Sequence, residues 1–319
     1  MSILARPAVA SLVAKTMQRA VLAAQRGTGR GSKASSLDRF PEFPRNAREL
    51  TVPTSVAPAR VVVHMPAADT GGQPPPVHVD FHGGGYVMPL TEMDDPICRY
   101  LAAEAGVAVI NVDYALAPQH RFPAPPHQAF EVVRWIASHG AEHGWDGSRL
   151  SVGGQSAGGG LAAAVARQSL EQGGPLIGLQ VLHYPPLDLA TNAKDKRAAI
   201  PKPMLRPWMA EVFDSAYVPD PRERADRLVS PGNPADVADL KGIAPALVIT
   251  AEFDLLKAEG TRYAERLRQA GALVEHYDVP QADHGYDGKD AEKARQVYAL
   301  IARHVKRAAE PNPAPPAKH

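Results

Sequence analysis

A serine that could act as a nucleophile lies in the segment GQSAG, residues 154–158. The longer stretch LSVGGQSAGGGLAAAVA, residues 150–166, predicts a short strand, a glycine-rich corner and a helix. Such a corner holds its serine in a strained backbone conformation and exposes the hydroxyl. The N–H of Ala157 lies at the start of the predicted helix, where the helix dipole favours negative charge. We therefore predict that Ser156 is a nucleophile for acyl transfer and that Ala157 helps to bind the oxyanion.

Three glycines after a predicted strand offer further donors. The strand covers residues 77–81 and ends in the sequence HGGG, which comprises His82, Gly83, Gly84 and Gly85. Successive glycines leave backbone N–H groups exposed and let a substrate carbonyl approach the main chain. A tight solvent turn is the alternative interpretation. Because acyl transfer uses two or three oxyanion donors and Ala157 supplies one, we favour an oxyanion loop formed by Gly83, Gly84 and Gly85.

An acid and a base for this serine follow two later strands. Asp254 comes just after a predicted strand at 246–250, and His284 just after one at 274–279. The chain order Ser, Asp, His is the order of α/β hydrolases. A single aspartate or histidine in such a place would more often be structural, and the chain has 12 histidines. Three suitable residues in order, each at the end of a strand, predict a catalytic triad of Ser156, Asp254 and His284.

The elements that must hold these residues alternate between strands and helices. Alternation at this spacing predicts a mostly parallel sheet with helices on both faces, whose active site lies beyond the carboxyl ends of the strands. The predicted fold class is α/β, of the α/β-hydrolase type with a helical cap. Besides those named above, the predicted elements are strands at 61–65, 107–114 and 179–183 and helices at 95–105 and 128–138.

Two segments outside the sheet predict the cap. Residues 9–24 form an amphipathic helix, and residues 187–230 are rich in proline and charge and have no sustained strand pattern. We predict an N-terminal cap helix and linker over 1–45, a catalytic domain over 46–308 with a cap insertion at 187–230, and a disordered proline-rich tail over 309–319. A surface excursion is the alternative for 187–230. The expected apolar face of the helix consists of Val9, Leu12, Val13, Met17, Ala20, Val21 and Ala24.

Composition limits the partners. Lys and Arg number 35 and Asp and Glu 34, so the net charge of +1 gives no field that would recruit nucleic acid. The expected partner is a small-molecule ester. The N-terminal helix packs on its own protein in our interpretation, with peripheral membrane contact as the alternative; a homodimer is left open. Cys98 is the only cysteine and is expected in the core. With no signal peptide or membrane span predicted, we expect a cytoplasmic protein.

Five motifs together resemble the hormone-sensitive lipase family of serine esterases. They are HGGG, GQSAG, YALAPQHRFPAP at 114–125, EFDLL at 252–256 and DHGY at 283–286, and the likeness spans roughly residues 55–305. The resemblance implies the triad Ser156, Asp254 and His284. It also implies an oxyanion hole of Gly84, Gly85 and Ala157, with Gly83 as a supporting turn residue. It further implies a carboxylesterase that acts on esters of small to medium acyl chains through an acyl-enzyme, without metal or cofactor.

Two positions depart from the family pattern. The family usually has GDSAG, where this chain has Gln155, and its acid loop usually resembles DPLxDE, where this chain has Leu255 and Ala258. We hypothesise that the missing carboxylate at position 155 lowers the pKa of His284. Two alternative functions stay open: an amidase, lactonase or thioesterase with the same triad, and a non-catalytic receptor for a small ligand.

Overall fold

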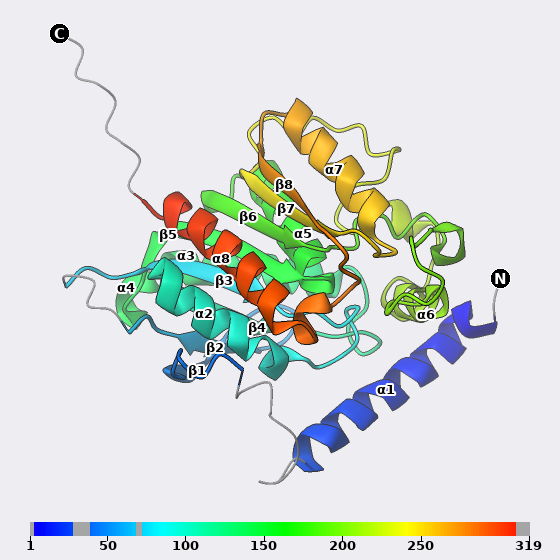
Figure 1. Ribbon diagram of the computed structural model, residues 1–319, viewed down its shortest axis with the longest axis horizontal. Coiled ribbons are helices and arrows are strands. Elements are labelled where there is room, and N and C mark those ends of the chain that lie inside the picture. The colour runs from blue at the N-terminus through cyan, green and yellow to red at the C-terminus, as the bar shows by residue number, and fades with distance from the viewer. Residues whose placement is uncertain (1–2, 28–38, 68–71, 311–319) are drawn as a thin grey trace.

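The computed structural model describes residues 3–27, 39–67 and 72–310. Within these residues, eight strands form one sheet in the order β1-β2-β4-β3-β5-β6-β7-β8 (Figure 1). The pairs β1/β2 and β2/β4 are antiparallel, and all other pairs are parallel. The strands are β1 (Ala47–Val52), β2 (Ala59–His64), β3 (Pro76–Phe81), β4 (Ala108–Asp113), β5 (Asp146–Gln155), β6 (Ile177–His183), β7 (Ala246–Ala251) and β8 (Leu273–Val279). The predicted α/β-hydrolase fold is confirmed.

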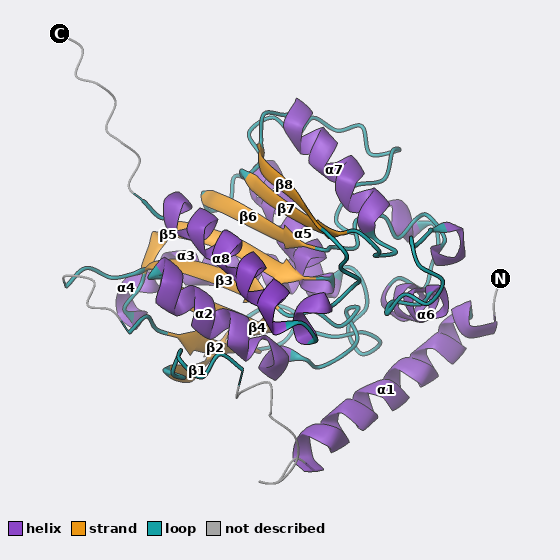
Figure 2. Cartoon of the chain, viewed as in Figure 1, coloured by secondary structure: helices purple, strands orange, loops and turns teal. Residues whose placement is uncertain are grey.

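Helices cover both faces of the sheet (Figure 2). The α-helices are α1 (Pro7–Gly27), α2 (Asp95–Ala105), α3 (Ala124–Ser138), α4 (Gly140–His143), α5 (Ala157–Gln172), α6 (Pro207–Tyr217), α7 (Lys257–Gln269) and α8 (Ala291–Ala308). Side chains of α3, α5 and α7 share one hydrophobic cluster with the sheet, and those of α2 and α8 share a second. The central strands are apolar on both sides because both sides are covered.

Most predicted elements agree with the structure. The helix predicted at 95–105 has these bounds as α2, and Cys98 on it is fully buried, as expected. Helix α3 begins at Ala124, four residues before the predicted start, because Pro125 and Pro126 fit a first helical turn, where no N–H partner is needed. Trp135 on this helix is half-buried and stacks on the ring of His139.

The buried face of α1 differs from the expected one. Ala10, Ala14 and Gln18 are buried, whereas Leu12 is 66% exposed. Helix α1 lies along α6 (Figure 1), and small residues allow two helices to approach closely. The amide of Gln18 donates to the carbonyl oxygens of Val87 and Ala117, at 2.8 and 2.9 Å. Of the expected face, Val9, Val13, Met17 and Val21 are half-buried, so the apolar pattern of α1 identified only one edge of the face that packs.

Two further expectations concern the chain ends and the membrane. Most of the predicted disordered tail, residues 311–319, lies outside the described residues. Among the helices of the described ranges, none combines the length and the apolar character that a membrane crossing requires.

Candidate active site

Ser156 lies at the sharp corner between β5 and α5. Its backbone has φ 51° and ψ −120°, a left-handed region that non-glycine residues rarely adopt. The strand and the helix pass so close to β3 that a Cβ at Gly158 would lie 1.7 Å from the carbonyl oxygen of Phe81. A glycine is therefore required at position 158. The predicted strand, corner and helix are present, with the strand beginning earlier, at Asp146, and the helix ending later, at Gln172.

The structure brings Ser156, His284 and Asp254 together. Ser156 Oγ lies 2.9 Å from Nε2 of His284, and Nδ1 of the same ring lies 2.7 Å from Oδ2 of Asp254. Asp254 follows β7 and His284 follows β8, so the carboxyl ends of neighbouring parallel strands bring the two side chains together. Asp254 is 2% exposed and His284 7% exposed. An imidazole held in this way can take a proton from the serine while the carboxylate orients it.

The charges around His284 favour its protonated form. Burial of the ring lowers its pKa, but the charge of Asp254 and the hydrogen bond to it raise the pKa by more. Asp283 and Asp287 add to the rise. The pKa of His284 therefore lies above the ordinary histidine value.

The HGGG loop lies beside the nucleophile. A Cβ at Gly83 would lie 3.7 Å from Cβ of Ser156, and Gly84 and Gly85 have φ values of 113° and 62°. Among the described residues, no acceptor is bonded to the N–H of Gly84 or Gly85. Ala157 is the first residue of α5, where an N–H has no partner within the helix. Gly83 thus brings the HGGG loop next to Ser156, and Ala157 adds an N–H at the start of α5.

Aromatic side chains that the sequence did not identify hold this loop. Tyr114 donates from its hydroxyl to the carbonyl oxygen of His82 at 2.9 Å, and the two rings stack with centroids 4.4 Å apart. Tyr86, just after the glycines, stacks on Tyr217 of α6 with centroids 4.1 Å apart. The sequence shows Tyr86 directly after HGGG, but its stacking partner Tyr217 lies 131 residues later, so the sequence did not reveal the pair.

The 187–230 insertion contacts both loops of the site. A Cβ at Gly85 would lie 2.5 Å from the ring of Phe213, and one at Gly285 would lie 2.8 Å from Cε of Met204. The N–H of Met204 donates to Oδ2 of Asp283 at 2.6 Å. The insertion is therefore in contact with the HGGG loop and with the histidine loop.

Gln155, at the position where the family usually has an acid, has a carboxylate as its neighbour. Its amide donates to Oδ2 of Asp287 at 2.9 Å, so a carboxylate from the histidine loop lies next to the side chain at position 155. Asp287 contributes to the raised pKa of His284. The hypothesis that an acid at position 155 would raise this pKa further stays a prediction, which the pH–rate profile of Gln155→Asp would test.

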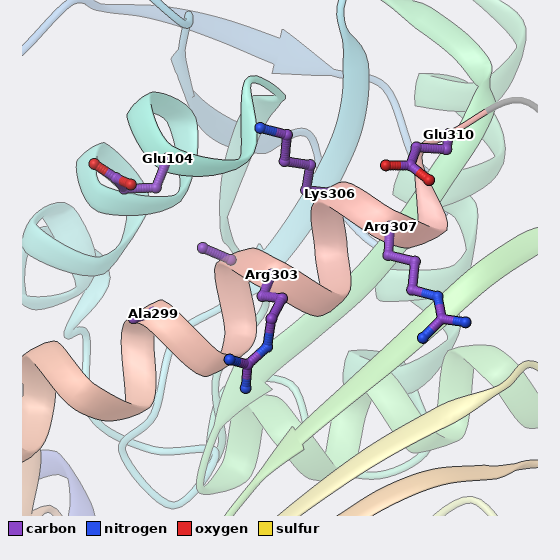
Figure 3. A pocket seen from close by; sticks show the side chains of 7 residues that line it. Glu104, Ala299, Arg303, Lys306, Arg307 and Glu310 are labelled. Carbon is purple, nitrogen blue, oxygen red and sulfur yellow. The ribbon is translucent and has the colours of Figure 1, made fainter.

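Two other features of the described residues bear on whether a second site exists. Within the described ranges, no group of three or more His, Cys, Asp or Glu side chains is placed to hold a metal ion. A groove of about 420 Å³ lies between α2 and the C-terminal half of α8, lined by Glu104, Ala299, Ala302, Arg303, Lys306, Arg307 and Glu310 (Figure 3). The histidine loop precedes the opposite end of α8, an 18-residue helix roughly 27 Å long at 1.5 Å per residue. None of the triad or HGGG residues lines the groove.

Known proteins resemble the chain in sequence and in fold. A family model described as "alpha/beta hydrolase fold" matches residues 78–287. The esterase LipI of Mycobacterium tuberculosis is 34% identical over 264 residues, which cover 79% of this chain and 78% of LipI. The carboxylesterase NlhH of the same species is 37% identical over 217 residues, 66% of each chain. A solved esterase of Pyrobaculum calidifontis has a TM-score of 0.79 at 30% identity and covers 94% of this chain and 93% of its own.

Proposed function

The chain belongs to the hormone-sensitive lipase-like family of α/β hydrolases, and from this membership we propose that it is a serine carboxylesterase. Its substrates in this proposal are carboxylic esters of small to medium acyl chains. The observation that carries the proposal is the unbroken hydrogen-bonded series from Ser156 Oγ through His284 to Asp254. The relatives that bear the names esterase and carboxylesterase support it.

The reaction proceeds through an acyl-enzyme. His284 takes the proton of Ser156 while the serine oxygen attacks the ester carbonyl, and the N–H groups of Gly84, Gly85 and Ala157 bind the oxyanion. The imidazolium returns the proton to the alcohol as the C–O bond breaks. A water molecule then attacks the acyl group, again with His284 as base, and the acid leaves as Ser156 recovers its proton. Asp254 stabilises the imidazolium in both halves.

We infer that α1 and the 187–230 insertion act as a cap that shapes substrate choice. Three contacts support this role: α1 packs along α6, Phe213 of α6 lies against Gly85, and Met204 lies against the histidine loop. Bulky side chains against both loops restrict the space for an acyl chain near the nucleophile, which favours small and medium esters.

Replacement of the nucleophile tests the proposal. Ser156→Ala should lower kcat for p-nitrophenyl acetate and butyrate by roughly 10⁴-fold or more, since only binding and the oxyanion hole remain. It should also abolish labelling by a fluorophosphonate probe. Ser169→Ala, on the same helix, is the matched control, because that hydroxyl only donates to the carbonyl of Pro175. Most of the activity surviving in Ser156→Ala would contradict the assignment. A preference for amides, lactones or thioesters in a substrate panel would change the substrate class.

A further inference from the structure

A buried carboxylate that takes no direct part in the proposed reaction lies three residues after His284. Asp287 is 3% exposed and accepts three hydrogen bonds from three different parts of the fold. The hydroxyl of Tyr184 donates to Oδ1 at 2.6 Å, and the hydroxyl of Tyr298 and the amide of Gln155 donate to Oδ2, each at 2.9 Å. Each carboxylate oxygen of Asp287 therefore has at least one hydrogen-bond donor.

The two phenols remain donors at any pH at which the enzyme would work. Burial raises the pKa of Tyr184 and of Tyr298 well above 10, and the charge of Asp287 raises both further. The guanidinium of Arg39 donates to the main-chain oxygen of Asp287 and not to its carboxylate. Arg39 is therefore not an ion-pair partner of the Asp287 carboxylate.

This cluster touches the triad at two points. The ring of Tyr184 lies against the imidazole of His284, with centroids 4.9 Å apart and planes at 59°. Tyr184 has φ 39°, a left-handed conformation that a bulky residue adopts only when its surroundings hold it there. Gln155 directly precedes Ser156, whose N–H donates to the carbonyl of His183. Asp287 is thus bonded to Tyr184, which contacts the base His284, and to Gln155, which precedes the nucleophile Ser156.

We propose that Asp287 is a positioning residue: its carboxylate holds the ring of Tyr184 against His284 and places a second buried negative charge near the imidazole. The inference rests on the proposed function, because it assigns Asp287 a part in the work of His284 as a base. Asp254 fixes the ring at Nδ1, whereas Asp287 acts through Tyr184 and through its charge. When the imidazole becomes cationic in the transition state, both charges stabilise it.

Other groups near His284 bear on the test. Asp254 and Asp283 carry negative charge on the β7 and β8 loops, and His183, at the end of β6, is neutral because burial lowers its pKa to about 4. From the insertion, the uncharged Met204 contacts the histidine loop. Removing the charge of Asp287 therefore leaves Asp254 and Asp283 as the acids that raise the pKa of His284.

The decisive variant is Asp287→Asn, compared with the parent in the pH dependence of kcat/KM for p-nitrophenyl acetate. We expect the acid limb to move to lower pH and the plateau of kcat/KM to fall about tenfold, mainly in kcat, as for the loss of one hydrogen bond to a charged group. Asp290→Asn is the matched control. That carboxylate caps α8 by accepting from the N–H groups of Glu292 and Lys293, and an asparagine oxygen can accept the same bonds. The melting temperature and the acid limb of this variant should therefore both stay close to those of the parent.

Three outcomes are informative. An Asp287→Asn enzyme with a lower melting temperature but an unmoved acid limb and unchanged kcat would overturn the inference and leave Asp287 a purely structural residue. If Asp287→Asn does not fold, Tyr184→Phe decides, since it keeps the ring but loses the bond: kcat should fall severalfold at constant KM, and an unchanged kcat overturns the inference. Activity that survives in Ser156→Ala would instead refute the proposed function, so the two failures can be told apart.

Discussion

The close approach of the nucleophile corner to β3 predicts a large effect for one added methyl group, in the variant Gly158→Ala. The new Cβ would lie 1.7 Å from the carbonyl oxygen of Phe81 and 2.9 Å from that of His82. Since carbon and oxygen in ordinary contact are about 3.3 Å apart, the first pair must separate by roughly 1.6 Å. The start of α5 and the HGGG loop, which follows directly from Phe81, would move apart. Both carry the proposed oxyanion donors.

A displacement of about 1 Å costs around 10²-fold in rate, and loss of one oxyanion donor costs about 10² to 10³. We therefore expect kcat/KM for p-nitrophenyl butyrate to fall by roughly 10² to 10³ and the protein to lose about 1–3 kcal/mol of stability from overpacking. The measurements are steady-state kinetics and chemical denaturation. Gly288→Ala is the control, because a Cβ there meets no atom within 4 Å. Parent-like kcat/KM in a folded Gly158→Ala enzyme would refute this account of the corner.

Three more predictions follow from the site and from the contact between the insertion and α7. Asp254→Asn should lower kcat by about 10⁴ with little change in KM, because the imidazole loses its orienting carboxylate; a loss below tenfold in steady-state assays would contradict this role. Because the pKa of His284 is raised, the acid limb of kcat/KM should lie above pH 6.5, and activity should fall as the pH drops through it. The raised pKa of His284 also stabilises the folded protein. This stabilisation is fully present below pH 6.5 and is lost as the pH rises through the pKa of His284 in the folded protein, and chemical denaturation at several pH values would detect it. Lys196→Met should destabilise the fold by roughly 3–5 kcal/mol, since it leaves Glu259, 2.6 Å away in a buried pair, without its partner; adding Glu259→Gln should restore part of this loss in urea unfolding.

Much of the fold could be predicted because its signals are local. The strand before Ser156, the glycine corner and the alanine-rich helix are neighbours in the chain, and the same holds for α2 with its bounds of 95–105. Asp254 and His284 could be identified because each directly follows a strand, and parallel strands bring their carboxyl ends to one edge of the sheet. The helices α7 and α8, which follow the two catalytic loops, were not predicted.

Contacts between distant elements needed the structure. The apolar pattern of α1 predicted a buried face that includes Leu12. Where α1 packs against α6, the buried residues are instead Ala10, Ala14 and Gln18. The sequence shows that position 155 lacks the family's acid, but only the fold shows that the carboxylate of Asp287 lies 2.9 Å from the amide of Gln155.

The sequence by itself thus determined the order of the elements and the identity of the three residues expected to react. These depend on backbone preference and hydrophobic period, which neighbouring residues encode. Only the tertiary structure decided which side chains surround them, such as Phe213 against Gly85 and Tyr184 against His284. Such contacts depend on how helices and loops pack across the whole chain, and the close packing of the interior admits one arrangement that no short stretch of sequence specifies.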